Sequence, residues 1–120
     1  MKAVFDTNIL IDFLQGHVPA RSELARYTEP SISIISWMEV LEGANAQTES
    51  ATRAFLAGFE VLGIDASVAQ LAVNLRRSGK IKLPDAVIWA TAKANQCLLV
   101  TRNGRDMDPN DPGVRIPYLR

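Results

Sequence analysis

The sequence contains very little of two residue types on which many enzyme sites depend. Its 120 residues include one cysteine, Cys97, and one histidine, His17. A single cysteine excludes an internal disulfide framework and a cysteine-rich zinc site. A single histidine excludes catalysis by paired histidines and gives no basis for a Ser-His-Asp triad. We expect Cys97, before an apolar segment, to be a buried apolar residue, and His17, close to Gly16 and Pro19, to lie in a loop.

Long apolar runs and an excess of charge of either sign are also absent. No apolar run approaches the length of about 18 residues that crosses a membrane, and no signal-like segment opens the chain. We therefore expect a cytoplasmic protein that does not associate with membranes. Thirteen Lys and Arg residues balance 13 Asp and Glu residues. Any nucleic-acid-binding surface must therefore be a local basic patch.

The remaining composition is typical of a folded globular chain. The sequence is 48% hydrophobic and 22% charged, which excludes an intrinsically disordered protein. A length of 120 residues suits one domain, residues 1–120. A chain of this size can bury about two-thirds of its unfolded surface.

Strand-like and helix-like segments alternate along the chain, which predicts an α/β fold with a mostly parallel sheet covered by helices on both faces. Pro117 restricts the last predicted strand to a sheet edge. Asp65 is a predicted N-cap, and Gly79 a predicted helix end. The predicted strands are 2–6, 31–35, 61–64, 97–101 and 114–118, and the predicted helices are 7–15, 20–27, 36–46, 48–59, 65–77 and 85–95.

Several acidic residues occupy positions at which such a sheet forms its ligand-binding crevice. They are Asp6, Glu39, Asp85 and Asp106. Three of them closely follow a strand-like run, and Asp85 begins a helix after Pro84. The carboxyl ends of the strands face the crevice of an open α/β sheet. Carboxylates about 5 Å apart there would repel each other by about 3 kcal/mol per pair. A hard divalent cation relieves this repulsion, and oxygen ligands suit Mg²⁺ or Mn²⁺.

Three of these acids also have purely structural interpretations. Asp6 could serve only as the N-cap of the following helix. Asp85, in a first helical turn, would interact favourably with the helix dipole. Asp106 could be an ordinary turn residue, and Asp108 and Asp111 in the same polar loop compete with it as ligands.

Glu39 has a structural interpretation of a different kind. Ser36 and Glu39 match a capping box, in which Ser36 caps the helix and Glu39 reaches back to its amide. Glu42, one turn further on, is an alternative ligand. Asp12 faces away from the apolar stripe of its predicted helix, so we expect it to be solvated.

Short motifs occur in a fixed order between residues 4 and 106. They are Asp6-Thr7-Asn8, Glu39 with Gly43, Asp85 at the start of an alanine-rich helix, and Thr101-x-Asn103-x-x-Asp106. In this order they resemble the motifs of PIN-domain ribonucleases, and among those the VapC-type toxins of bacterial toxin–antitoxin pairs. Each motif alone is weak evidence, and the ordered set is more specific.

The resemblance implies a PIN-like three-layer fold and a metal-dependent endoribonuclease that hydrolyses RNA phosphodiester bonds. It assigns catalysis and the binding of Mg²⁺ or Mn²⁺ to Asp6, Glu39, Asp85 and Asp106, and it selects Glu39 over Glu42. Hydroxyl and amide side chains beside the acids would bond the ligands or water, unless they only cap helices or strand ends. These auxiliary residues are Thr7, Asn8, Thr101 and Asn103.

Basic residues near the acids are candidates for contacts with RNA phosphates, and their alternative role is a solvated helix end. They are Arg76, Arg77, Lys80, Lys82, Arg102 and Arg105. The resemblance also implies a small antitoxin whose helix fills an apolar groove, and we expect a homodimer. Residues that would line this groove, or else belong to the core, are Phe13, Leu14, Trp37, Met38, Phe55 and Phe59.

Two other functions fit parts of the sequence. A phosphatase of the haloacid dehalogenase type also places a nucleophilic Asp after its first strand, but it requires a second Asp where this chain has Asn8. A non-catalytic binding module could keep the PIN fold, although the complete set of acids argues against it. A dinucleotide-binding domain is disfavoured because the sequence contains neither G-x-G-x-x-G nor a P-loop.

Overall fold

A parallel sheet forms the centre of the structure, a computed structural model that describes residues 2–120. Its five strands lie in the order β3-β2-β1-β4-β5, and each adjacent pair is parallel. This arrangement confirms the predicted α/β fold with a mostly parallel sheet. The strands are β1 (Ala3–Phe5), β2 (Pro30–Ser33), β3 (Glu60–Leu62), β4 (Leu98–Val100) and β5 (Val114–Arg115).

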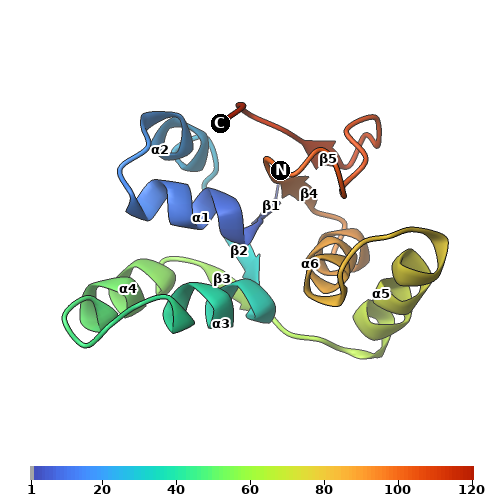
Figure 1. Ribbon diagram of the computed structural model, residues 1–120, viewed down its shortest axis with the longest axis horizontal. Coiled ribbons are helices and arrows are strands. Elements are labelled where there is room, and N and C mark those ends of the chain that lie inside the picture. Colours follow the sequence, from blue (N-terminus) through green and yellow to red (C-terminus); the bar gives the residue numbers. More distant parts are fainter. Residues whose placement is uncertain (1) are drawn as a thin grey trace.

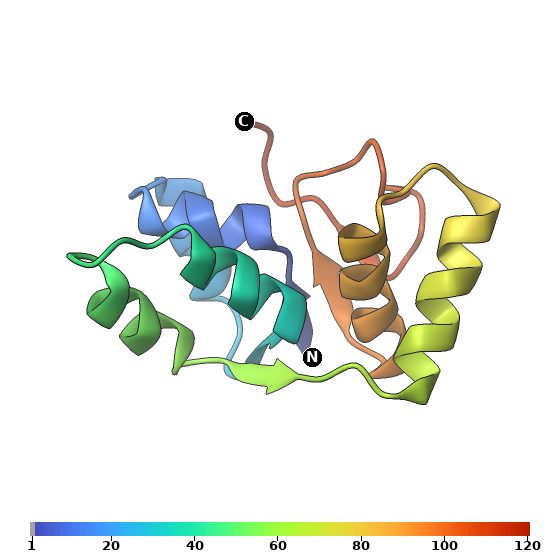
Figure 2. The same cartoon turned by 60° about the horizontal axis from the view of Figure 1, so that its bottom comes forward.

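Helices cover both faces of this sheet and complete three layers. Helices α1 to α4 gather on one side of the strands, and α5 and α6 lie on the other (Figures 1 and 2). They are α1 (Thr7–Leu14), α2 (Val18–Leu24), α3 (Ile34–Glu42), α4 (Glu49–Leu56), α5 (Ala66–Ser78) and α6 (Leu83–Ala94). Within residues 2–120, none of the helices has both the length and the apolar character needed to cross a membrane.

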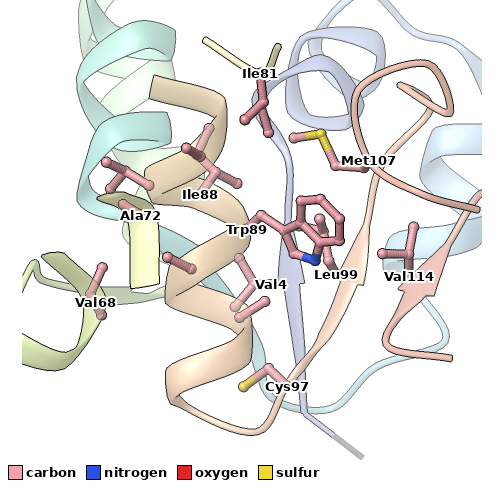
Figure 3. Close-up of a cluster of buried hydrophobic side chains, with 14 residues drawn as sticks. Val4, Val68, Ala72, Ile81, Ile88, Trp89, Cys97, Leu99, Met107 and Val114 are labelled. Carbon is pink, nitrogen blue, oxygen red and sulfur yellow. The ribbon is translucent and has the colours of Figure 1, made fainter. Parts of the chain in front are cut away.

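The alternation of side chains along β1 divides the core into two clusters. Successive residues of a strand point to opposite faces of a sheet. Val4 packs into a cluster with residues of α5 and α6, including Val68 and Ile88 (Figure 3). Ala3 and Phe5 pack into a second cluster with residues of α1 to α4. Both faces of the central strand are therefore buried, which explains its continuously apolar sequence.

The beginning of α3 differs from the sequence prediction. The strand predicted over 31–35 ends at Ser33, and Ser33 Oγ accepts a hydrogen bond from the amide of Ile35 at 3.0 Å. Ser33, and not Ser36, is thus the N-cap, and the predicted capping box of Ser36 and Glu39 is wrong. Ile35 packs against the α5–α6 cluster, and this packing outweighs the strand preference of its β-branched side chain.

Smaller differences occur at other boundaries. The helix predicted over 20–27 spans Val18–Leu24, with Pro19 in its first turn and His17 as its N-cap instead of a free loop residue. The helix predicted over 48–59 ends at Leu56. The last strand covers only Val114–Arg115, but it is an edge strand, as Pro117 predicted. The predicted helix cap at Asp65 is confirmed, since its side chain accepts from the amide of Val68.

The strand order contains one topological switch point, and it positions the site. The chain adds β2 and then β3 on one side of β1, and returns to add β4 and β5 on the other side. The connection that follows β1 leads to α1 on one face of the sheet, whereas the connection that follows β4 leads to the edge strand β5. In open α/β sheets the crevice at such a point is where ligands bind.

Candidate active site

Asp6 lies at the carboxyl end of β1, at the switch point. Its side chain is buried and only 3% exposed. One carboxylate oxygen accepts a hydrogen bond from the amide of Thr7 at 2.7 Å, and the other accepts from the Thr101 hydroxyl at 2.7 Å. The Asn8 side-chain amide donates to this second oxygen at 3.4 Å. Asp6 is therefore the N-cap of α1, as its structural interpretation predicted, and it also lies beside the switch point of the sheet.

Asp106 is connected to Asp6 through the loop that follows β4. The Thr101 hydroxyl, which donates to Asp6, accepts a hydrogen bond from the amide of Asn103 at 2.9 Å. The Asn103 side-chain amide donates to the Asp106 carboxylate at 3.1 Å, and its carbonyl oxygen accepts from the Asp106 amide at 3.3 Å. The Thr-x-Asn-x-x-Asp motif thus folds into one hydrogen-bonded turn that ties Asp106 to the end of β1.

Glu39 reaches the same place from α3. It lies in the middle of the helix, on the turn after Ser36, and one carboxylate oxygen accepts a hydrogen bond from the Thr7 hydroxyl at 2.7 Å. The Thr7 hydroxyl oxygen is also 2.9 Å from the Ser36 hydroxyl oxygen. Thr7 therefore joins the start of α1 to α3 and orients Glu39. Glu42 lies at the last position of the same helix and is exposed.

Asp85 completes the group from the first turn of α6. Burial raises its pKa, the negative charges of Asp106 and Glu39 raise it further, and Lys82 opposes these effects. Burial likewise raises the pKa of Asp6 to about 6, with further contributions from the charges of Asp85 and Glu39. The hydrogen bonds from Thr101 and Thr7 lower the pKa of Asp6 but do not offset its burial.

These mutual effects show that the four predicted acids share one electrostatic environment. The ion pairs found within residues 2–120 include none of the four. Their oxygen donors and uncompensated charge fit a hard divalent cation such as Mg²⁺ or Mn²⁺. In the described part of the chain, however, no three acidic, histidine or cysteine side chains already stand in a metal-binding arrangement. Binding a cation there would require side-chain rotation of the more exposed acids.

Two further acids, Asp12 and Glu23, are buried in the structure, and the sequence analysis did not predict this. Asp12 is 1% exposed and accepts hydrogen bonds from Arg102, Tyr118 and Arg120 at 2.6–3.3 Å. The prediction that Asp12 is solvated is therefore wrong. Burial alone would raise its pKa, but these hydrogen bonds outweigh burial and hold it below the ordinary value. The partners lie about 90 residues or more away in the sequence, so the local pattern of α1 carries no signal for them.

Glu23 is the second buried acid of this kind. It is 4% exposed, and its two carboxylate oxygens accept from the Arg115 guanidinium at 2.7 and 3.0 Å. Tyr27 also donates to Glu23 at 2.9 Å. Burial would raise the pKa of Glu23, but its hydrogen bonds with Arg115 and Tyr27 hold it below the ordinary value. In contrast to the four site acids, Asp12 and Glu23 have guanidinium partners within the fold.

The predicted basic contacts divide into two groups. Arg102 pairs with Asp12 at 2.7 Å, and Arg76 donates to the Ile81 carbonyl oxygen at 2.8 Å, so both side chains have structural partners. Lys80 and Arg105 are exposed and border a cavity that also includes Asp106. Arg77, in the last turn of α5, and Lys82, the residue before α6, are also exposed.

The apolar residues predicted to line a groove are only partly exposed. Phe13, Trp37, Phe55 and Phe59 are half-buried against the second core cluster, whereas Leu14 and Met38 are 44% and 47% exposed. A groove of about 480 Å³ lies between α1 and the α3–α4 pair, and Leu14 is the one residue of the predicted six in its lining. Its apolar lining residues include Ile11, Leu14, Val40, Ala44 and Ala51. Phe13, Phe55 and Phe59 line a separate hollow beside α2.

Comparisons with known proteins agree with this geometry. Residues 3–108 match the PIN domain family. A toxin–antitoxin complex from Klebsiella pneumoniae contains a chain with 42% identity and a TM-score of 0.92, with 98% of this chain and 99% of that chain covered. A DNA-bound VapBC complex from Salmonella typhimurium gives 26% identity, a TM-score of 0.76 and coverage of 97% and 96%. A comparison with curated protein sequences returns no match.

Proposed function

Given that this chain belongs to the PIN-domain family, we propose that it is a metal-dependent endoribonuclease that hydrolyses RNA phosphodiester bonds. Asp6, Glu39, Asp85 and Asp106 would be its catalytic and metal-binding residues. The observation that supports this proposal is the convergence of the four acids at one place: Thr7 and Thr101 hold Glu39 and Asp6, Asn103 holds Asp106, and the charges of Glu39, Asp85 and Asp106 contribute to the raised pKa of Asp6 or Asp85. None of the four belongs to the ion pairs found within residues 2–120. A site of this kind is suited to a divalent cation, which in turn would bind a phosphate group of the RNA.

The hydrogen bonds of the site hold the side chains of Asp6, Glu39 and Asp106 to different extents. Asp6 is fixed by two hydrogen bonds of 2.7 Å and would serve as the rigid ligand. Glu39 is held by one hydroxyl, that of Thr7, and Asp106 by the amide of Asn103. Bound Mg²⁺ or Mn²⁺ would activate a water molecule and shield the phosphate charge. Lys80, Lys82 and Arg105 would attract the RNA backbone to this acidic crevice.

The same geometry disfavours an aspartyl-nucleophile phosphatase. Asn8 stands where such an enzyme requires an acid, and its amide donates to Asp6 at 3.4 Å. A side-chain amide cannot exchange a proton with the leaving group as a carboxyl group does.

We further propose that the protein is the toxin of a toxin–antitoxin pair that acts in the cytoplasm. This proposal rests on the likeness to the chain of the Klebsiella pneumoniae toxin–antitoxin complex, which extends over 98% of this chain. The antitoxin would place an amphipathic helix in the groove between α1 and the α3–α4 pair, where Ile11 and Leu14 are 38% and 44% exposed. A homodimer is the proposed oligomeric state.

Cleavage of a panel of structured RNAs with Mn²⁺, with Mg²⁺ and with EDTA tests the nuclease proposal. We expect cleavage that depends on the metal and is lost in Asp6→Asn, because Asn keeps the cap of α1 but removes the charge. Metal-independent cleavage, or equal cleavage by Asp6→Asn, would contradict the proposal.

Growth of bacteria that express the chain alone tests the toxin proposal: wild type should arrest growth and Asp6→Asn should not. Light scattering of the purified protein tests the homodimer.

A further inference from the structure

A cavity next to the proposed catalytic acids has no role in the function described so far. It lies between the segment that joins α5 to α6 and the loop after β4, and its volume is about 520 Å³. Asp106 forms part of its wall, so anything bound in it lies directly beside the acid site. A volume of this size is typical of a small-molecule site, for which the usual range is about 300–1,000 Å³.

The lining of this cavity combines an apolar floor with a charged rim. Leu75, Ile81 and Trp89 line this floor, of which Ile81 and Trp89 are core residues that are only 4% and 9% exposed. Figure 3 shows Trp89 projecting from α6 toward Leu99, with Ile81 and Met107 above its ring. Lys80 and Arg105, one from each bordering segment, line the cavity together with Asp106 and Asp108. A ligand that has both a flat apolar part and an anionic group fits this distribution.

We propose that this cavity binds one ribonucleotide of the RNA, the nucleotide next to the bond that is cut. This inference rests on the proposed ribonuclease function. The base would lie against Leu75 and the small exposed part of Trp89, and its phosphate would face Lys80 and Arg105. The flat faces of bases pack against apolar side chains with little dependence on sequence, and cations at the rim bind phosphate. Because Asp106 belongs to both the cavity and the proposed catalytic site, a nucleotide bound in the cavity would place the adjacent phosphate of the RNA at the catalytic acids.

The backbone around the cavity is held in place without a ligand. The Arg76 guanidinium donates to the Ile81 carbonyl oxygen at 2.8 Å, which fixes the segment between α5 and α6. On the opposite side, Asn103 holds the turn that carries Asp106. A preformed cavity avoids the cost of ordering its walls when a ligand binds.

Gly79 offers a way to fill the cavity without strain. Its φ of −154° is extended backbone that any residue adopts, and an added Cβ would be 3.7 Å from the Leu75 carbonyl oxygen, an ordinary contact. Gly79→Leu would therefore place a side chain at the cavity wall while the fold is kept. Gly63→Leu is the matched control, because Gly63 lies in the connection between β3 and α5 and an added Cβ there meets nothing within 4 Å.

The first test is a titration of the Asp6→Asn protein with AMP, CMP, GMP and UMP. NMR signals of the two tryptophan indole N–H groups report the binding. We expect the Trp89 signal to shift with nucleotide and the Trp37 signal to stay, and we expect Gly79→Leu, but not Gly63→Leu, to abolish the shift. No shift at Trp89, or equal shifts at both tryptophans, would overturn the inference.

The second test measures steady-state cleavage of an RNA oligonucleotide by the metal-loaded protein. Gly79→Leu should raise KM by about tenfold, the loss expected for the contacts of one base, while Gly63→Leu should match wild type. If wild type cleaves RNA and Gly79→Leu has an unchanged KM, the cavity is not a subsite and the ribonuclease proposal stands. If wild type fails to cleave RNA although nucleotides shift Trp89, the ribonuclease proposal fails instead.

Discussion

Asp12 of α1 accepts a hydrogen bond of 2.7 Å from the Nε of Arg102. Arg102 directly follows Thr101, whose hydroxyl group donates to Asp6. The amide of Arg102 also donates to the side chain of Asn8 at 3.4 Å. Arg102 therefore fastens the start of the loop after β4 to α1 at two points, Asn8 and Asp12. Adjacent residues of this loop therefore hold one acid of the proposed active site, Asp6, and the buried carboxylate of Asp12.

The first prediction concerns this ion pair. Asp12→Asn should lower the free energy of unfolding by about 2–3 kcal/mol, less than for a fully buried pair, because the arginine partners are partly exposed. Urea denaturation at neutral pH measures this loss. Because the pKa of Asp12 is held below its ordinary value, its charged form stabilises the fold above that value and the contribution is lost on acidification through the lowered pKa. Asp108→Asn, an exposed loop acid, is the control; a loss equal to that control would contradict the prediction.

The second prediction concerns the charge of Asp6. Its pKa is raised from 3.8 to about 6, so the charged form is disfavoured in the folded protein. The fold therefore loses stability as the pH rises from about 4 through 6, and this penalty is absent when Asp6 is replaced by Asn. The stability of Asp6→Asn relative to wild type should rise by up to about 3 kcal/mol between pH 4 and pH 7.5. Urea midpoints in EDTA across this range measure it, and a constant difference would refute it.

The third prediction separates two glutamates of α3. Glu39→Gln keeps an oxygen that accepts from the Thr7 hydroxyl, whose present distance is 2.7 Å, and removes one charge from the site. Stability should change by less than about 0.5 kcal/mol, while cleavage should fall by about 100-fold or more and Mn²⁺ should bind more weakly. Glu42→Gln, one turn away on the same helix, should change neither quantity. Calorimetric Mn²⁺ titration and RNA cleavage decide between the two, and equal losses would mean that the motif assigns the wrong glutamate.

The fourth prediction concerns the basic residues. Lys80→Gln and Arg105→Gln should each reduce the slope of log affinity against log salt for single-stranded RNA by about 0.7. Arg76→Gln should leave that slope unchanged and lower stability, because Arg76 holds the Ile81 carbonyl oxygen. Fluorescence anisotropy at several salt concentrations, with Asp6→Asn as the background, provides the measurement. A reduced slope in Arg76→Gln would show that its guanidinium also reaches the RNA.

The fifth prediction concerns the proposed antitoxin groove. Leu14→Glu and Ala51→Glu would place charges on the apolar lining and should weaken binding of the partner by at least about tenfold, since a desolvated charge lacks a counter-ion there. Leu119→Glu is the control, because Leu119 is 89% exposed and outside the groove. Co-purification and titration with the product of the neighbouring gene test this. Unchanged binding in both groove variants would locate the partner elsewhere.

Local sequence patterns predicted much of the architecture because they report on short-range physics. The caps at Asp6 and Asp65 involve amides one and three residues away, and the apolar run before Asp6 reflects a strand buried on both faces. The alternation of such elements was sufficient to predict a parallel α/β sheet. Local patterns were insufficient at the start of α3: the β-branched residues after Ser33 favour a strand, but Ser33 is the N-cap and Ile35 packs against the α5–α6 cluster.

The sequence by itself thus determined the elements, the parallel sheet and the identity of the acids proposed for the site. Only the tertiary structure decided which acids have partners, because charge compensation depends on residues that are distant along the chain. Asp12 looks like a solvated helix residue until Arg102, Tyr118 and Arg120 arrive from the other end of the sequence. Asp6 and Asp85 instead meet further carboxylates. The fold pairs the buried acids Asp12 and Glu23 with arginines, whereas the ion pairs found within residues 2–120 include none of the four acids at the switch point.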